Sequence, residues 1–279
     1  MQLAELKNYF ESELANYYPS EEAQSFFILL SEAWLDYSRM DVSLNASEVI
    51  PSELISKYKN ALERLQLNEP IQYIIGSTEF YGLPLVVSPD TLIPRPETEE
   101  LVRWILEYDR KKVKILDVGT GSGCIAIALA RMMPEAEVTA MDISDKALEI
   151  ARKNADLNQV KVSFLQTDIL AVHALPEQYD LIVSNPPYVR EQEKSYMHDN
   201  VLLYEPDTAL FVSESDPLIF YRAICRLALR HLKQDGLLFF EINEYLSKEM
   251  ESLLKEEGFQ NIEVGVDFRG KDRFLRCTL

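Results

Sequence analysis

Hydrophobic positions in the first part of the chain follow the spacing of helices. Apolar residues recur there at intervals of three and four, which places them on one face of an α-helix. The recurring series are Leu3, Leu6, Phe10 and Leu14, then Ala23, Phe27, Leu30, Trp34 and Tyr37, and then Leu54, Tyr58, Leu62 and Leu65. We therefore predict a small all-α domain over residues 1–70. Acidic residues outnumber basic ones in this segment, which indicates either solvated helix faces or a docking surface for a substrate.

The pattern changes after Pro70. Two β-rich runs between Ile71 and Val87 flank the region from Gly76 to Gly82, and this arrangement predicts a β-hairpin. We expect residues 71–95 to form a hairpin and linker between two domains. The segment Ile93-Pro94-Arg95-Pro96-Glu97-Thr98-Glu99 then opens a helix with acidic residues in its first turn, where they favour the helix dipole.

From Lys114 onward, apolar strand-like runs alternate with helical patterns. The predicted strands are Lys114–Val118, Glu137–Asp142, Val162–Thr167, Asp180–Ser184, Gly236–Ile242, Asn261–Asp267 and Phe274–Thr278. The predicted helices between them are Ile125–Met133, Lys146–Leu157, Leu218–Leu232 and Tyr245–Glu256. Such alternation is typical of βαβ units and a mostly parallel sheet. The short link between the last two strands predicts an antiparallel pair, so residues 96–279 should form an α/β domain with a seven-stranded, Rossmann-like sheet.

Charge and composition limit the classes of partner. The chain is 47% hydrophobic and 27% charged, an ordinary globular composition, and its net charge is −18. A nonspecific nucleic-acid binder needs a positive field to displace counterions from phosphates. We therefore expect no direct binding of nucleic acid. No apolar run approaches the length of a membrane span, and the N-terminus lacks a signal-peptide pattern, so we expect a cytoplasmic chain with no membrane association.

The cysteines and histidines give no metal site. The three cysteines are Cys124, Cys225 and Cys277, and the three histidines are His173, His198 and His231. None forms a C-x-x-C pair or another spacing typical of zinc ligands. We predict no metal and assign these residues to packing or the surface.

A glycine-rich turn follows the first strand of the α/β domain. The sequence Asp117-Val118-Gly119-Thr120-Gly121-Ser122-Gly123 leads directly into a helix. Glycines at such a turn let the backbone approach a ligand at the helix N-terminus. The spacing G-x-G-x-G, with Cys124 where a dinucleotide fingerprint has its last small residue, favours a nucleoside cofactor without a pyrophosphate.

Carboxylates end the next two strands. Asp142 closes one of them, where its oxygens can accept hydrogen bonds from both ribose hydroxyls of a nucleoside. Its alternative role is to cap the following helix, but Ser144 and Asp145 are better placed to do so. Asp168 closes the third strand and could bind an exocyclic amine, with Ile169 beside a purine ring. An ordinary loop aspartate is the alternative at that position.

The fourth strand stops at Ser184-Asn185-Pro186-Pro187-Tyr188-Val189. Consecutive prolines cannot continue a sheet, because neither has an N–H to donate. They form a stiff corner that presents an amide and an aromatic ring. These constellations all lie at the carboxyl edge of the predicted sheet, where open α/β sheets bind ligands.

The combination of motifs resembles a known family. The G-x-G-x-G turn, the acidic strand ends and the N-P-P-Y corner resemble class I S-adenosylmethionine-dependent methyltransferases that modify a planar nitrogen. The segments Gly76–Gly82, Leu92–Glu99 and Tyr204-Glu205-Pro206, together with Asp267-x-x-Gly270-x-x-Arg273, resemble the glutamine methyltransferases of peptide chain release factors, the PrmC/HemK family. The resemblance covers nearly the whole chain, although the N-terminal part carries no sharp motif.

The resemblance implies methyl transfer from S-adenosylmethionine, with S-adenosylhomocysteine as product, to the glutamine of the Gly-Gly-Gln loop of release factors. The cofactor-binding residues it predicts are Asp117, Gly119, Thr120, Gly121, Ser122, Gly123, Asp142, Ile143, Asp168, Ile169 and Asn185. The predicted substrate-binding residues are Asn185, Pro186, Pro187, Tyr188, Arg95 and Glu205. Asn185, Pro186 and Tyr188 among them are the predicted catalytic residues.

Related chemistries remain open. The same motifs could serve a glutamine of a ribosomal protein, or the amino group of adenine in DNA or RNA. A non-catalytic cofactor-binding module and a nicotinamide-dependent oxidoreductase are less consistent with an intact N-P-P-Y corner. The segment from Val189 to Asp216 has little periodicity and contains Glu205-Pro206. We expect it to help receive the substrate, because long connections are often binding loops.

Overall fold

The computed structural model describes residues 1–108 and 112–279. The chain divides into two compact units. The first unit comprises Met1–Gly76 and His198–Tyr204, and the second comprises Ser77–Met197 and Glu205–Leu279. A short segment of the C-terminal half therefore belongs to the helical first unit.

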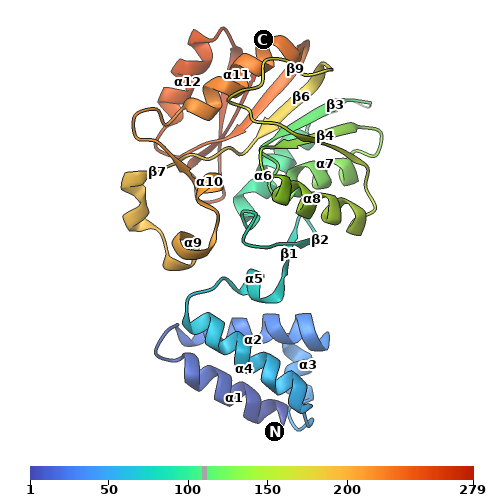
Figure 1. Cartoon of the computed structure of the whole chain (residues 1–279), viewed down its shortest axis with the longest axis vertical. Coiled ribbons are helices and arrows are strands. Elements are labelled where there is room, and N and C mark those ends of the chain that lie inside the picture. The colour runs from blue at the N-terminus through green and yellow to red at the C-terminus, as the bar shows by residue number, and fades with distance from the viewer. Residues whose placement is uncertain (109–111) are drawn as a thin grey trace. The chain divides into compact units, whose positions relative to one another are not determined.

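The first unit is all helical, as the periodicity predicted (Figure 1). Its helices are α1 (Leu3–Leu14), α2 (Ser20–Leu35), α3 (Arg39–Leu44), α4 (Ser52–Gln66), α5 (Ile71–Ile75) and α9 (Asp199–Tyr204). Aromatic rings form its centre, where Phe10 and Phe27 lie with centroids 5.6 Å apart in an edge-to-face arrangement. Tyr58 is fully buried beside them and shares a 2.9 Å hydrogen bond with Ser31. The helix α9 is tied to this unit by the hydroxyl of Tyr204, which donates to the carbonyl of Leu67 at 2.8 Å.

The expectation of two β-rich runs after Pro70 is wrong for the first run. Residues Ile71–Ile75 form the short helix α5, which begins after Pro70 and ends at Gly76 in the left-handed conformation, with φ of 85°. Ile71 and Ile74 are buried in the helical core. A proline before the first turn and a glycine after the last one are helix boundaries, and here they outweigh the β propensity of the isoleucines.

The hairpin itself is shorter than predicted and belongs to the second unit. It consists of β1 (Ser77–Phe80) and β2 (Leu83–Val86), paired antiparallel. Two asparagines of a later helix hold β2. The Asn154 side chain exchanges hydrogen bonds with the backbone N–H and carbonyl of Val86, at 2.6 and 2.9 Å, and Asn158 donates to the carbonyl of Pro84 at 2.8 Å.

The second unit contains the predicted seven-stranded sheet, in the order β10-β11-β9-β6-β3-β4-β5. Its strands are β3 (Lys114–Val118), β4 (Glu137–Asp142), β5 (Val162–Gln166), β6 (Tyr179–Ser184), β9 (Leu232–Glu241), β10 (Gln260–Val266) and β11 (Asp272–Thr278). The first five of these run parallel, and β11 pairs antiparallel with both β9 and β10. The mostly parallel sheet with an antiparallel end is therefore confirmed.

Helices cover both faces of this sheet (Figure 1). They are α6 (Pro96–Leu106), α7 (Cys124–Met132) and α8 (Asp145–Leu157) on one face, and α11 (Ile219–His231) and α12 (Ser247–Glu256) on the other. Successive residues of a strand point to opposite faces, so Ile115 packs in one layer and Leu116 in the other. This explains why the inner strands read as continuous apolar runs without alternation.

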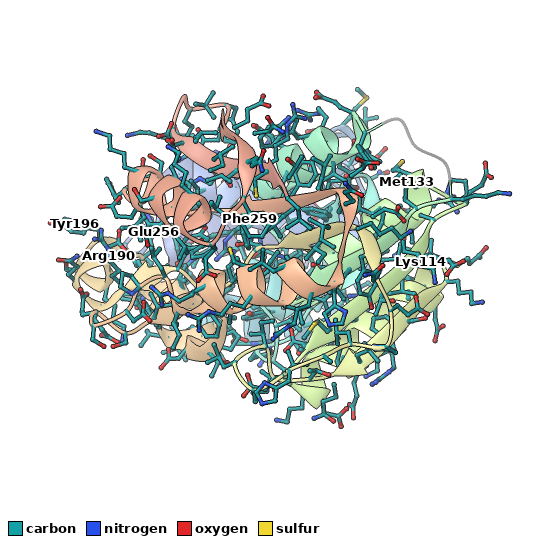
Figure 2. All side chains as sticks on the ribbon, turned by 90° about the horizontal axis from the view of Figure 1, so that it is seen from above. Lys114, Met133, Arg190, Tyr196, Glu256 and Phe259 are labelled. Atoms are coloured by element: carbon teal, nitrogen blue, oxygen red, sulfur yellow. The ribbon has the colours of Figure 1, made fainter. Side chains whose placement is uncertain are left out.

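The segment after β6 is built from short elements. They are β7 (Val189–Arg190), the 3₁₀ helix η1 (Glu191–Tyr196), α9, α10 (Asp207–Leu210) and β8 (Phe211–Val212). β7 and β8 pair in parallel. Figure 2 shows Arg190 and Tyr196 on the opposite side of the second unit from Lys114, which begins β3. β7 and η1 thus lie away from the amino end of β3.

Candidate active site

A cavity of about 410 Å³ opens at the carboxyl ends of β3, β4, β5 and β6. The predicted residues on its wall are Arg95, Gly119, Thr120, Gly121, Ser122, Asp142, Ile143, Asp168, Ile169, Asn185, Pro186 and Pro187. Parallel strands present their carboxyl ends at one edge, which brings together residues that are distant in sequence. Asp117, Gly123, Tyr188 and Glu205 are the predicted site residues that do not line the cavity.

The glycine-rich turn between β3 and α7 lines the cavity at this edge of the sheet. Gly119, Gly121 and Gly123 all have positive φ values, of 73°, 54° and 84°. Gly123 also packs against α8, since an added Cβ there would be 3.1 Å from Ala151 Cβ of that helix and 2.9 Å from Ile127 Cδ1. The turn therefore needs glycine both for its backbone conformation and for close packing of the helix behind it.

Asp117 is completely buried behind the turn. Its Oδ2 accepts a 2.6 Å hydrogen bond from the Thr120 hydroxyl, whereas Oδ1 has no hydrogen-bond partner in the described part of the chain. Burial raises the pKa of Asp117 to about 7. The Thr120 hydroxyl and the nearby N–H of Ala126 oppose this rise, although the Ala126 N–H forms no hydrogen bond with Oδ1. An unpaired buried carboxylate oxygen is costly, and a cationic ligand near the turn would relieve this cost.

Asp142 is the last residue of β4, and each of its carboxylate oxygens accepts a hydrogen bond from a backbone N–H. Oδ2 accepts the N–H of Gly121 and Oδ1 the N–H of Ser144, each at 2.9 Å. Burial raises the pKa of Asp142, and these backbone bonds oppose the shift. The helix α8 is capped by Ser144, whose hydroxyl accepts the N–H of Ala147. Asp142 therefore does not cap the helix, and each of its oxygens keeps a lone pair for a diol.

Two apolar side chains that follow β4 and β5 are exposed. Ile143 is 61% exposed and Leu170 is 46% exposed, and both line the cavity. Asp168, which also lines the cavity, accepts the N–H of Leu170 at 2.8 Å through Oδ1. Exposed aliphatic side chains flanking a carboxylate provide the surface that a purine ring and its amine would cover.

The N-P-P-Y corner closes the other end of the cavity. Ser184, the last residue of β6, donates its hydroxyl to the carbonyl of Val118 at 2.7 Å, which fixes the corner to the turn after β3. The Tyr188 hydroxyl donates to Glu241 Oε1 at 3.0 Å, and its carbonyl accepts from Asn243 at 3.1 Å. Burial, followed by the charge of Glu241, raises the pKa of Tyr188. Tyr188 is therefore held as a neutral phenol.

Two polar residues that link to Asn185 were not predicted from the sequence, and neither was Leu170. Thr98, in the first turn of α6, accepts the Asn185 side-chain N–H at 3.3 Å and donates to Glu241 Oε2 at 2.6 Å. Thr98 and Glu241 are each only 2% exposed. One signal was present, because Glu241 is the single acidic residue in the apolar run Leu237–Ile242. A charge inside a buried strand usually has a specific partner.

Arg95 and Glu205 form an ion pair of 2.6 Å at the cavity rim. The carboxylate of Glu205 also accepts the backbone N–H of Ile93 at 3.1 Å. Glu205 is 5% exposed, whereas the Arg95 side chain is 32% exposed. This pair joins the segment before α6 to the segment after α9, and it leaves part of the guanidinium accessible from the cavity.

Cysteine and histidine contribute little to the site. Cys124 lines the cavity, and burial raises the pKa of its thiol to about 12, so it is not a thiolate nucleophile.

No group of three metal-ligating side chains occurs within residues 1–108 and 112–279. In the same residues, no helix has the length and hydropathy that crossing a membrane requires.

Comparisons with known proteins match both units. The methyltransferase small domain family matches residues 98–215, and the PrmC N-terminal domain family matches residues 5–76. The release factor glutamine methyltransferase of Flavobacterium psychrophilum is 47% identical over 98% of this chain and 99% of its own length. That of Bacteroides thetaiotaomicron is 42% identical over 97% and 98%. Among solved structures, a methyltransferase from Pyrococcus furiosus has the same fold, with a TM-score of 0.55 and 18% identity over 79% of this chain and 98% of its own.

Proposed function

Since the chain belongs to the release factor glutamine methyltransferase family, we propose that it methylates the side-chain amide nitrogen of the Gly-Gly-Gln glutamine in peptide chain release factors. It is a class I enzyme that depends on S-adenosylmethionine. The observation that carries the proposal is the position of Asn185 and Pro186. They lie on the wall of the same cavity as the glycine turn and Asp142.

The residues present fit the cofactor. Asp142 offers acceptors to the ribose hydroxyls, and the exposed side chains of Ile143 and Leu170 offer an apolar surface to the adenine. The unpartnered Oδ1 of Asp117, buried behind the turn and outside the cavity wall, offers a negative charge that attracts the ammonium group at a distance or through a water. When bound, the cofactor supplies an electrophilic methyl group on a sulfonium.

The substrate amide needs to be oriented, because its nitrogen lone pair is delocalised. The side-chain oxygen of Asn185 and the backbone carbonyl of Pro186 can each accept one N–H of the substrate NH₂ group. The fixed φ of proline holds the second acceptor in place. Two fixed acceptors aim the nitrogen, and such a near-attack geometry can lower a barrier by ~7–11 kcal/mol.

Neither the cavity wall nor the N-P-P-Y corner contains a histidine among the described residues. An amide nitrogen becomes strongly acidic when it acquires a fourth bond, so its proton can pass to water after methyl transfer. We propose that the chain's contribution is orientation of the amide, with no side chain acting as a general base.

Tyr188, Arg95 and Glu205 keep their predicted substrate roles as proposals. We propose that the Tyr188 ring stacks on the substrate amide while its hydroxyl stays hydrogen-bonded to Glu241. Arg95 lines the cavity, and its guanidinium can donate to the carbonyl of the substrate amide while it stays paired with Glu205.

We further propose that the helical residues 1–70 dock the release factor, with residues 71–95 as the connection and residues 96–279 as the catalytic domain. The similarity of residues 5–76 to the PrmC N-terminal domain supports a dedicated role for this part. We place the enzyme in the cytoplasm, where release factors meet ribosomes, and we expect no direct binding of nucleic acid, because the net charge is −18.

Methyl transfer from labelled S-adenosylmethionine tests the proposal, with purified release factor, ribosomal protein and nucleic acid as parallel substrates. We expect label on the release factor alone. The label should disappear with the Asn185→Ala enzyme and with a release factor whose loop glutamine is replaced. Label on the ribosomal protein or on nucleic acid instead would assign the enzyme to a neighbouring substrate class.

A further inference from the structure

The side chain of Asn185 has two possible orientations with opposite consequences. Its amide carries an oxygen, which accepts hydrogen bonds, and an NH₂ group, which only donates. With the oxygen toward the cavity, Asn185 accepts the N–H of a substrate amide. With the NH₂ toward the cavity, it meets the substrate NH₂ with like partial charges. Asparagine has no intrinsic preference between these orientations, so the surroundings must select one.

A chain of hydrogen bonds that runs from Thr98 on the cavity wall to the buried Glu241 makes that selection. The Asn185 Nδ2 donates to Thr98 Oγ1 at 3.3 Å, and Thr98 Oγ1 donates to Glu241 Oε2 at 2.6 Å. The other oxygen of Glu241 accepts the Tyr188 hydroxyl at 3.0 Å. Each hydroxyl has only one hydrogen. Because Thr98 gives its hydrogen to Glu241, its oxygen presents only lone pairs to Asn185.

The fold brings these residues together from three elements. The strands β6 and β9 pair with Ser184 opposite Phe240, so Asn185 and Glu241 leave the sheet at neighbouring positions. Thr98 comes from the first turn of α6, which packs on β9. Thr98 and Glu241 are almost completely buried. Water therefore cannot readily replace the missing partner if one of them is removed.

The charge of Glu241 is supported from β11. Burial raises the pKa of Glu241, while the hydroxyls of Thr98 and Tyr188 and the charge of Arg273 oppose the shift. Arg273 is held in place by a 3.3 Å ion pair with the buried Asp267. The carboxyl thus receives hydrogen bonds on both oxygens and has a cation nearby. These contacts favour the ionised acceptor over the protonated donor and oppose the effects of burial and of the charge of Glu97.

We propose that Thr98 and Glu241 are positioning residues that hold the amide of Asn185 with its oxygen toward the cavity. Neither residue needs to touch the substrate. The inference rests on the proposed function, because it assigns the oriented oxygen to the NH₂ group of a glutamine side chain. Tyr188 completes the arrangement by occupying the second oxygen of Glu241.

Thr98→Val is the main test, because valine keeps the branched shape and removes only the hydroxyl. Thr98→Ser restores the hydroxyl and is the rescue variant. Thr78→Val on β1, outside the site, is the matched control for the exchange of threonine for valine in the same unit. Glu241→Gln is compared with Glu263→Gln, whose carboxylate pairs with Arg276 on an exposed strand.

We expect Thr98→Val to lower kcat for release factor methylation by about a hundredfold, the loss typical of a small misplacement at a reacting centre. The KM for the release factor and the Kd for S-adenosylmethionine should change by less than about twofold, and Thr98→Ser should recover most of kcat. In an Asn185→Ala background, Thr98→Val should have no further effect, because Thr98 acts through Asn185. A Thr98→Val enzyme with normal kcat, or additive losses in the double variant, would overturn the inference.

A spectroscopic readout separates this inference from the proposed function. The side-chain ¹⁵N–H₂ signals of Asn185 are identified as the pair that is absent from the Asn185→Ala spectrum. We expect slow solvent exchange for one of these protons in the wild type and in Thr98→Ser, and faster exchange in Thr98→Val. Equal exchange in all three proteins would overturn the inference. If the wild type leaves release factors unmethylated while this pattern holds, the proposed substrate is wrong and the orientation of Asn185 stands.

Discussion

The two halves of the site are organised in different ways. In the cofactor half, each carboxylate accepts a hydrogen bond from a neighbour in sequence: Asp117 from Thr120, Asp142 from Ser144 and Asp168 from Leu170. Asp142 has one longer-range contact as well, with the N–H of Gly121, 21 positions away. In the substrate half, Asn185 is held by Thr98, 87 positions away, and Thr98 by Glu241, 143 positions away. Local contacts form with the turn itself, whereas distant contacts require the completed sheet. The cofactor half should therefore govern affinity for the cofactor, and the substrate half should govern turnover.

The largest expected effect is that of Asn185→Ala. Removing the acceptor from the N-P-P-Y corner should reduce kcat for release factor methylation by about a hundred- to a thousandfold, because the substrate nitrogen is no longer aimed. The Kd for S-adenosylmethionine, measured by calorimetry, should change by less than about threefold, because the ribose and purine contacts remain. An equally large loss of cofactor affinity would break the proposed division between the halves.

The reciprocal variant is Asp142→Ala in the cofactor half. Losing two charged hydrogen bonds to the ribose should weaken cofactor binding by about 2–3 kcal/mol, or roughly 30- to 150-fold. With saturating cofactor, kcat should recover to within about fivefold of the wild type. Asp142→Asn keeps one acceptor oxygen and should show a smaller loss of affinity. Thermal unfolding of both variants serves as the control for damage to the turn.

The same contrast explains what could be predicted from the sequence. The strands β3 and β4 were predicted with their observed bounds, because a buried parallel strand needs a continuous apolar run. The glycine turn and the acidic strand ends could be predicted from the sequence, because each lies next to the strand that positions it. Thr98 and Glu241 were not found, because their partnership exists only after α6 packs on β9. The helix α5 was misread for a related reason, since the helical core decides its conformation.

The pH dependence of cofactor binding is the next prediction, and it depends on Asp117. Its pKa is raised to about 7 in the folded protein, above the ordinary value of 3.8. The cofactor-free fold therefore binds this proton more tightly than the unfolded chain does. This group favours the fold most below pH of about 4 and loses that contribution as pH rises to about 7.

Binding of a cation near Asp117 requires the ionised form, so cofactor binding should release a proton. Affinity for S-adenosylmethionine should fall by about tenfold between pH 8 and pH 6. Asp117→Asn should bind the cofactor more weakly at pH 8 and lose most of this dependence. Titration in two buffers with different ionisation enthalpies counts the released protons. Binding that is independent of pH in this range would show that Asp117 does not meet the cofactor's charge.

The smallest effect is expected at the Arg95–Glu205 pair, and it sharpens the boundary of the substrate half. If Arg95 donates to the substrate carbonyl, Arg95→Ala should raise the KM for the release factor by about tenfold, the equivalent of one hydrogen bond from a charged group. Glu205→Gln removes the negative partner but leaves the guanidinium in place. It should raise the KM by only about two- to threefold, by loosening the segment around Ile93.

The ratio of these two effects decides the role of Arg95. A purely structural ion pair predicts equal losses, because breaking a pair from either side loosens the same segment. A donor to the substrate predicts the larger loss for arginine. Glu137→Gln, in an exposed ion pair with Lys114, is the control for removing a carboxylate at the surface, where such pairs contribute little. Equal KM values for Arg95→Ala and Glu205→Gln would place Arg95 outside the substrate half and leave the orientation of the amide to Asn185 and Pro186.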